Sequence, residues 1–235
     1  MQNINVNETF PANITPSTKT KQNKWIIYFL GLGLGFVVAA LMHEFLQAQD
    51  TQIERWIFSF TTNDNFYIYN RITLMGESFL LVPISLLIIL GWLLKKQWLL
   101  AAGMAMSVIG GGTLTLILKI LFRSYRPNQI NDLIVKMNYG FPSGHSVMSI
   151  LFWGFLCYVL IKNIPNKKIR WIIGIGAALI PLVVGMTRLM LGVHYPTDIL
   201  GGWMIGAMWL GLTISSLGFI DRFINRPDKA QKNQP

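Results

Sequence analysis

Three basic side chains stand at spacings that would suit a bound phosphate group. Lys119 and Arg126 are separated by six residues in "KILFRSYRP", and Arg188 lies in "TRLMLGVHYPTD". The planar guanidinium group of arginine can hold two phosphate oxygens at once, and lysine adds a compact positive charge. Because the transition state of phosphoryl transfer spreads negative charge over the phosphoryl oxygens, such cations could stabilise it. We predict that Lys119, Arg126 and Arg188 bind a phosphate group.

The stretch "YGFPSGHSV" (139–147) places bendable and polar residues just before an apolar run. Gly144 would let the backbone approach phosphate oxygens closely, and Ser143 offers a hydroxyl group and an N–H. Pro142 fits the entry to a helix. The free N–H groups and the positive dipole end of a helix that begins here would favour an anion. The sequence therefore predicts that Ser143 and Gly144 bind the same phosphate group.

Two histidines and one aspartate could carry out covalent chemistry at this phosphate. His194 stands four residues before Asp198, whose carboxylate would accept a hydrogen bond from one ring nitrogen. The lone pair of the other nitrogen would then be free to attack phosphorus, and histidine can form covalent intermediates of this kind. His145 would protonate the leaving alkoxide and later activate water. We predict catalytic roles for His194, His145 and Asp198.

These residues must be positioned by long apolar segments. The chain has 235 residues, is 52% hydrophobic and only 13% charged, and is too apolar for an ordinary soluble domain. The segment 50–71 mixes aromatic and charged residues, which is typical of the membrane interface. We predict an all-α polytopic membrane protein, a bundle of six transmembrane helices with one interfacial helix. The six segments that are long enough to cross a bilayer are 25–46, 72–94, 98–122, 145–161, 171–191 and 199–220.

The distribution of basic residues predicts the orientation of these segments. With the N-terminus in the cytoplasm, most of the 20 lysines and arginines fall in cytoplasmic segments, as the positive-inside rule requires. Residues 1–24 and 221–235 are then flexible cytoplasmic tails on either side of a membrane domain, 25–220. The third and fifth segments end, and the fourth and sixth begin, on the extracytoplasmic side. All the candidate residues therefore lie at one depth on that side.

Taken in order, the three motifs resemble a known family signature. The pattern K-x6-R-P, then P-S-G-H, then S-R-x5-H-x3-D is that of the type-2 phosphatidic acid phosphatases, in the superfamily that also contains vanadium haloperoxidases. The resemblance covers about residues 72–220 and implies a membrane lipid phosphatase with a phosphohistidine intermediate on His194. One position differs, because Thr187 stands where the family usually has serine. Threonine keeps the hydroxyl group, but its extra methyl group changes the local packing.

Composition also bears on partners and cofactors. The formal net charge of +10 is explained by basic cytoplasmic loops beside anionic lipid, and no basic patch is interleaved with aromatic residues as in a nucleic-acid-binding protein. The single cysteine, Cys157, excludes a disulfide within the chain. No acidic cluster or Cys/His spacing indicates a metal site, so we predict activity without a metal or another cofactor. The oligomeric state is left open.

Each motif has a simpler explanation when it is taken alone. Lys119 could extend its ammonium group to the interface, and the two arginines could anchor lipid head groups. "PSGH" could be only a turn, and Asp198 could cap the sixth span. These explanations do not account for the shared depth or the ordered spacings.

Outside the motifs we prefer the simpler explanations. His43 beside Glu44, at the end of the first span, is interpreted as an interfacial polar pair. Glu77, near the outer end of the second span, is also interpreted as interfacial, with a role in tuning the site as the alternative. Gly110, Gly111 and Gly112 lie within the third span, where they indicate close helix packing.

The sequence is compatible with three functions. The first is hydrolysis of a lipid phosphate monoester or diphosphate at the outer leaflet, and phosphatidylglycerol phosphate, phosphatidic acid and undecaprenyl diphosphate all agree with the resemblance. The second is phosphotransfer, in which an alcohol captures the phosphohistidine. The third is a non-catalytic lipid-phosphate binder or transporter, which broken helices at mid-membrane would favour. The candidate residues lie at one face instead, and this favours the hydrolase.

Overall fold

The computed structural model describes residues 20–127 and 139–224, and all regular structure within these ranges is helical. Six helical stretches there are long and apolar enough to cross a membrane, which confirms the predicted all-α bundle of six spans. The third stretch is α-helical at both ends and contains a π-helix, Ala105–Gly110, in its middle. The α-helices are α1 (Thr20–Phe45), α2 (Gln47–Phe58), α3 (Asn63–Ile72), α4 (Ser78–Leu94), α5 (Trp98–Met104), α6 (Gly111–Phe122), α8 (Gly144–Asn163), α9 (Lys167–Met190) and α10 (Pro196–Ile224).

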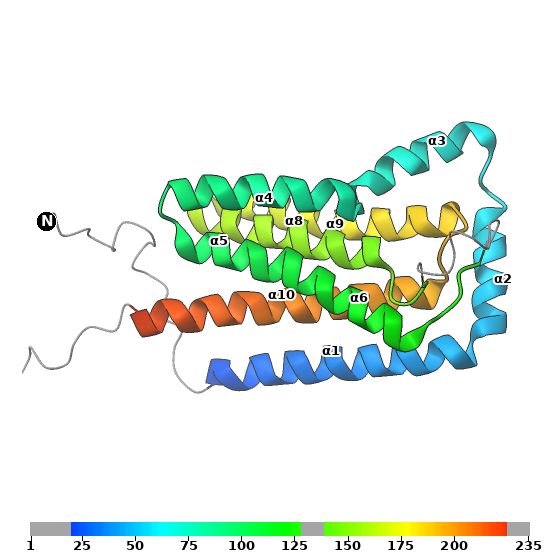
Figure 1. Cartoon of the computed structure of the whole chain (residues 1–235), viewed down its shortest axis with the longest axis horizontal. Coiled ribbons are helices and arrows are strands. Elements are labelled where there is room, and N and C mark those ends of the chain that lie inside the picture. Colours follow the sequence, from blue (N-terminus) through cyan, green and yellow to red (C-terminus); the bar gives the residue numbers. More distant parts are fainter. Residues whose placement is uncertain (1–19, 128–138, 225–235) are drawn as a thin grey trace, which may run out of the picture.

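The long helices run side by side, and α2 lies across one end of the bundle (Figure 1). From α2 the chain continues into α3, which leads back to α4 at an angle to the bundle axis (Figure 1). The segment 50–71, for which we predicted an interfacial element, thus falls on two helices. Helix α1 begins, and helix α10 ends, at the opposite end of the bundle (Figure 1).

Local sequence explains where several helices begin. Thr62 precedes α3, and its side chain accepts a hydrogen bond from the backbone N–H of Asn65 while the Asn65 side chain accepts one from the Thr62 N–H. Asn166 caps α9 by accepting from the N–H groups of Lys168 and Ile169. Helix α10 begins at Pro196, where a missing N–H costs nothing because the first turn has no acceptor for it.

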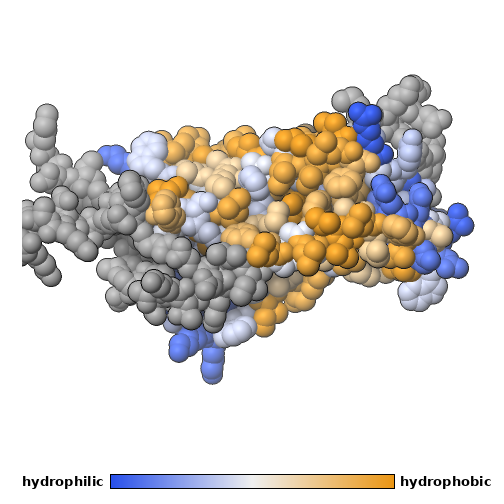
Figure 2. All heavy atoms as spheres, turned by 90° about the horizontal axis from the view of Figure 1, so that it is seen from below, coloured by the Kyte–Doolittle hydropathy of each residue, from blue (hydrophilic) through white to orange (hydrophobic). Residues whose placement is uncertain are grey.

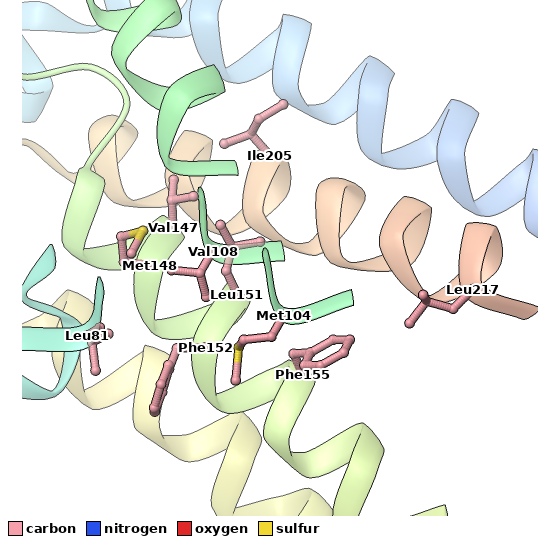
Figure 3. Close-up of a cluster of buried hydrophobic side chains, with 10 residues drawn as sticks. All are labelled: Leu81, Met104, Val108, Val147, Met148, Leu151, Phe152, Phe155, Ile205 and Leu217. Atoms are coloured by element: carbon pink, nitrogen blue, oxygen red, sulfur yellow. The ribbon is translucent and has the colours of Figure 1, made fainter. Parts of the chain in front are cut away.

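Helix α8 lies at the centre of the apolar core (Figure 3). Val147, Met148, Leu151, Phe152 and Phe155 of this helix pack together with buried side chains of its neighbours. Those neighbouring side chains come from α4, α5, the π-helix and α10 and are Leu81, Met104, Val108, Ile205 and Leu217. A helix surrounded in this way holds its first turn in a fixed place, and that turn carries the "PSGH" motif.

Glycines allow the helices around α8 to approach closely. A Cβ atom at Gly111 would lie 2.3 Å from Cδ1 of Leu151 and 2.8 Å from Cδ1 of Trp209, and one at Gly110 would lie 2.9 Å from Cζ2 of Trp209. Separations this short leave no room for a side chain. The interpretation of this glycine run as a helix-packing point is confirmed.

The outward faces of the helices are apolar. Large side chains such as Phe79, Leu94 and Trp171 are mostly exposed. Figure 2 shows apolar residues over the middle of the molecule and hydrophilic residues toward both ends, including the end that α2 crosses. Such a surface is unfavourable in water and suits contact with lipid tails.

Candidate active site

Four helix ends bring the predicted site residues to the same end of the bundle. Helices α6 and α9 end there, and helices α8 and α10 begin there, beside α2 (Figure 1). Lys119 lies in the last turn of α6 and Arg188 in the last turn of α9. His145 and Asp198 lie in the first turns of α8 and α10, and His194 lies two residues before the start of α10.

His194 and Asp198 form the centre of the site. Nδ1 of His194 lies 3.0 Å from Oδ2 of Asp198, and the backbone N–H of Tyr195 donates to the same oxygen over 3.0 Å. Asp198 therefore orients His194 and also closes the first turn of α10. Because a carboxylate accepts hydrogen bonds, Nδ1 of His194 carries the proton and Nε2 keeps its lone pair. Nε2 is buried and has no hydrogen-bond partner within the described part of the chain.

Positive charges surround this imidazole. Complete burial holds the pKa of His194 well below its ordinary value, and the nearby charges of Arg126, Arg188 and Lys119 lower it further. Burial also lowers the pKa of Arg126, while Asp198 acts in the opposite direction. The structure thus brings all three predicted cations within electrostatic range of His194.

Lys119 and Arg188 are held by different contacts. Lys119 donates hydrogen bonds to the backbone carbonyls of Tyr139 and Gly140, just before the "PSGH" motif. Nη1 of Arg188 donates to the Thr73 hydroxyl over 3.2 Å, while Nε of Arg188 is buried with no acceptor among the described residues. An unused, buried guanidinium N–H is costly unless a ligand accepts from it.

The start of α8 differs in one respect from the expectation. Ser143 is the residue before the helix, and its N–H donates to the backbone carbonyl of Asp198 over 2.9 Å. This N–H is therefore not available to a phosphate group, contrary to the prediction. The Ser143 hydroxyl is buried and makes no hydrogen bond to any residue that the structure describes. At Gly144 a Cβ atom would point toward Lys119, with 3.8 Å between it and Cε.

His145 has an acidic partner that the sequence interpretation missed. Its Nε2 lies 2.8 Å from Oε2 of Glu77, at the start of α4. A carboxylate at this distance stabilises the protonated imidazole, the form that a general acid needs. The preferred interpretation of Glu77 as an interfacial residue is wrong. Its place at the outer end of a span allowed a role in the site as the alternative, but could not by itself select that role.

Two further sequence expectations can be compared with the structure. The Thr187 hydroxyl donates to the backbone carbonyl of Val184 over 2.7 Å, so the hydroxyl is used within α9. The interpretation of His43 as an interfacial partner of Glu44 is wrong. Nδ1 of His43 lies 2.8 Å from Oγ1 of Thr197, and Nε2 lies 2.6 Å from Oγ of Ser124. His43 thus lies beside Asp198, with 3.6 Å between its Nδ1 and Oδ1 of Asp198.

Helical spans whose ends gather two imidazoles, a carboxylate and three cations define a membrane enzyme site suited to phosphate esters. The family model described as the PAP2 superfamily matches residues 98–221 of this sequence. The chain belongs to the PAP2 superfamily and is a multi-pass membrane lipid phosphatase, a phosphoric ester hydrolase. The resemblance drawn from the three motifs is confirmed.

Individual relatives agree with this assignment. The chain is 33% identical over 148 residues to phosphatidylglycerophosphatase B of Bacillus subtilis, which covers 60% of this chain and 70% of that protein. It is 26% identical over 154 residues to an undecaprenyl-diphosphatase of Sulfolobus acidocaldarius, with 63% and 69% covered. A crystal structure of a PAP2-type phosphatidylglycerolphosphate phosphatase from Bacillus subtilis superposes with a TM-score of 0.72 at 28% identity. It covers 84% of this chain and 98% of that one.

Proposed function

We propose that this phosphatase hydrolyses phosphatidylglycerol phosphate at the extracytoplasmic face of the membrane, through a phosphohistidine on His194. The main support for this mechanism is the hydrogen bonding of the two ring nitrogens of His194. Its Nδ1 is held by Asp198, and its buried Nε2 has no protein partner within the described ranges. A lone pair that is kept unbonded among cations suits attack on an anionic phosphate group.

In the first step the Nε2 lone pair of His194 attacks phosphorus and the bond from phosphorus to the lipid oxygen breaks. His145 donates a proton to that oxygen, so that the lipid leaves as an alcohol. The carboxylate of Asp198 stabilises the positive charge that develops on the His194 ring. Glu77 favours the protonated form of His145 before the step, because its carboxylate lies at ion-pair distance.

In the second step water attacks the phosphohistidine. His145, now neutral, accepts a proton from the water while the bond between phosphorus and Nε2 breaks. Inorganic phosphate is released, and both histidines return to their starting states. One general acid–base group thus serves both half-reactions.

Lys119, Arg126 and Arg188 supply the charge neutralisation that the transferring phosphoryl group needs. Fixed cations in a site that excludes water stabilise developing negative charge strongly, because they need no reorganisation as the reaction proceeds. The Ser143 hydroxyl would add a further hydrogen bond to a phosphoryl oxygen. We therefore propose that activity requires no metal ion, and a chelator should leave it unchanged.

The comparisons support the choice of substrate. The Bacillus subtilis relative and the superposed structure are both named for phosphatidylglycerol phosphate, and the Sulfolobus acidocaldarius relative is named for undecaprenyl diphosphate. A site at the ends of the helices would admit the phosphate group while the lipid tails remain in the bilayer. We place undecaprenyl diphosphate and phosphatidic acid second.

The decisive experiment measures phosphate release by the purified protein from these three lipids, side by side, with a chelator present. We expect the highest kcat/KM with phosphatidylglycerol phosphate and a loss of about 10⁴-fold or more in His194→Asn, because the nucleophile is gone. Glu44→Gln, at an exposed residue in the last turn of α1, is the matched control and should keep full activity. Full release by His194→Asn would refute the assigned nucleophile, and transfer to an added alcohol in place of phosphate release would favour the phosphotransferase.

Orientation needs its own test. In a Cys157→Ser background, Gln52→Cys on α2 and Lys168→Cys at the start of α9 place single exposed cysteines at opposite ends of the bundle. We expect a membrane-impermeant thiol reagent applied to intact cells to label the first and not the second. The reverse pattern would place the site on the cytoplasmic side.

A further inference from the structure

A group of four polar residues, called the polar layer, lies against Asp198. Two of the four come from helices that precede the stretch matched by the family model. His43 comes from α1, Asp50 from α2, Ser124 from the segment after α6, and Thr197 from the start of α10. The family model begins at residue 98, so His43 and Asp50 lie outside it. The side chains of His43, Asp50 and Asp198 are all at least four-fifths buried.

The hydrogen bonds of this layer fix the proton position on His43. The Thr197 hydroxyl donates its single proton to Oδ2 of Asp50. Its oxygen can therefore only accept from Nδ1 of His43, which lies 2.8 Å away. Nδ1 of His43 thus carries a proton, whatever the state of Nε2 beside Ser124.

The same nitrogen faces the unused half of the Asp198 carboxylate. Oδ2 of Asp198 accepts from His194 and from the Tyr195 backbone. Oδ1 is buried and has no hydrogen bond within the described residues, and Nδ1 of His43 lies 3.6 Å from it. A buried carboxylate oxygen with no partner is costly, and a polarised N–H at this distance reduces that cost.

The ring of His43 is held in place from two more sides. It stacks on Phe141, with 5.0 Å between the ring centroids, and Phe141 is fully buried just before the "PSGH" motif. Nε2 contacts Oγ of Ser124, and the Ser124 carbonyl accepts from the N–H of Gly140 over 2.8 Å. One imidazole therefore links α1 to three of the segments that carry the candidate site.

We propose that His43 is a positioning residue of this phosphatase: with Thr197 and Asp50 behind it, it holds the Asp198 carboxylate in the place that orients His194. His43 does not touch the substrate and acts only through Asp198. The inference rests on the proposed role of His194, and it assigns a catalytic contribution to helices α1 and α2. Loss of the His43 N–H should slow formation of the phosphohistidine and leave lipid binding unchanged.

Three substitutions separate this role from simple packing. His43→Asn can keep a donor near the position of Nδ1, His43→Gln can keep a polar group only near the position of Nε2, and His43→Phe keeps the stacking on Phe141 alone. We expect kcat to fall about 10- to 100-fold in the Phe and Gln variants with KM unchanged, as for other groups that orient a reacting residue. The Asn variant should retain most of kcat. Glu44→Gln is the control.

A readout that does not depend on turnover completes the test. The chain contains three histidines, so spectra of protein labelled with ¹⁵N-histidine in detergent are simple to assign with the variants. We expect Nδ1 of His43 to be protonated, and the Nδ1–H resonance of His194 to shift in His43→Phe and not in Glu44→Gln. The melting temperature of each variant controls for folding.

The outcomes are distinguishable from failure of the proposed function. If His43→Gln equals or exceeds His43→Asn, or if the His194 resonance is unchanged in His43→Phe, the positioning role is wrong while the phosphatase mechanism stands. If His194→Asn keeps full activity, the mechanism is wrong, and the spectra still decide whether His43 orders Asp198.

Discussion

The middle of the bundle differs in the hydrogen bonding of buried polar atoms from its polar end, which is the end where α8 and α10 begin. In the middle, the hydroxyls of Ser85, Ser107 and Thr115 are buried, and each donates to a backbone carbonyl over 2.7–3.0 Å. At the polar end, the Ser143 hydroxyl and Nε2 of His194 are buried without a hydrogen bond to any described residue. The described residues satisfy these hydroxyls in the middle, whereas at the end they leave the Ser143 hydroxyl and Nε2 of His194 available to a ligand.

Close packing shows a contrast at one position. Around α8, glycines such as Gly103 and Gly111 bring helices so near that an added methyl group would overlap a neighbouring side chain. Gly76 and Gly202 at the polar end are packed as tightly, since a Cβ atom there would lie 2.7 Å from the His145 carbonyl oxygen and 2.8 Å from the Ser143 carbonyl oxygen. A Cβ atom at Gly144 would meet only Lys119 among the described residues, at an ordinary contact distance of 3.8 Å. Glycines therefore hold the helices together at both levels, and Gly144 keeps room beside Lys119.

After the His194→Asn variant, the largest effect at the polar end is expected from removal of the proton donor, His145. His145→Gln should lower kcat about 10²- to 10⁴-fold on a lipid substrate, because the lipid alkoxide then leaves unprotonated. In the first half-reaction the loss should be much smaller with nitrophenyl phosphate, whose leaving group needs no proton, whereas hydrolysis of the phosphohistidine should slow equally with both substrates. Rapid-mixing measurement of both substrates checks this, and equal losses on the two in the first half-reaction would contradict the assigned role.

A pair of serines tests the comparison directly. Ser143→Ala should lower kcat/KM about 10²-fold, since a hydrogen bond to the transition state is lost, with no loss of stability. Ser107→Ala should lower the free energy of unfolding by about 1 kcal/mol, since the hydrogen bond to the Leu151 carbonyl is lost, with kcat unchanged. Phosphate release and denaturation in detergent separate the two, and the comparison fails if both variants change the same quantity.

A pair of glycines tests the packing side. Gly111→Ala should destabilise the protein by about 1–3 kcal/mol, because the new methyl group overlaps Leu151 and Trp209. A Cβ atom at Gly174 in α9 would meet no described residue within 4 Å, so Gly174→Ala should be neutral or stabilising by up to about 1 kcal/mol, because alanine favours the helix. Thermal unfolding in one detergent measures both. Equal stability of the two variants would contradict close packing at Gly111.

The smallest effect concerns pH. The pKa of His194 is lowered from 6.5, so its reactive neutral form persists at pH values where an ordinary histidine is protonated. We therefore expect kcat/KM to fall on the acid side with a midpoint below pH 6.5. The profile must be corrected for the second ionisation of the phosphate group, near pH 6. A corrected midpoint at or above 6.5 would show that burial and the nearby cations do not lower the pKa of His194.

Much of the fold and of the candidate site could be predicted from the sequence. The six apolar segments follow from length and hydropathy, because a membrane-spanning helix must satisfy its own backbone hydrogen bonds. The pairing of His194 with Asp198 is local, since the two residues are four positions apart at the start of one helix. The placement of the eight candidate residues at one end follows from the alternating direction of the spans.

Other parts depend on contacts between distant residues. His43 is 154 positions from Thr197 and 81 from Ser124, and Glu77 meets His145 from another span. No local pattern distinguishes such residues from polar groups at the membrane surface, since both kinds lie at the ends of spans. The use of the Ser143 N–H by the Asp198 carbonyl was likewise invisible along the chain.

The sequence by itself determined the number of spans, the three motifs and the pairing of His194 with Asp198, because these depend on hydropathy and on spacing within one helix or loop. Only the tertiary structure decided which polar atoms are already used and which are left for a ligand. The physical reason is that a hydrogen bond depends on distance in space and not on distance along the chain. Folding brings α1, α4, α8 and α10 together, and no local sequence pattern shows which of their residues will be in contact.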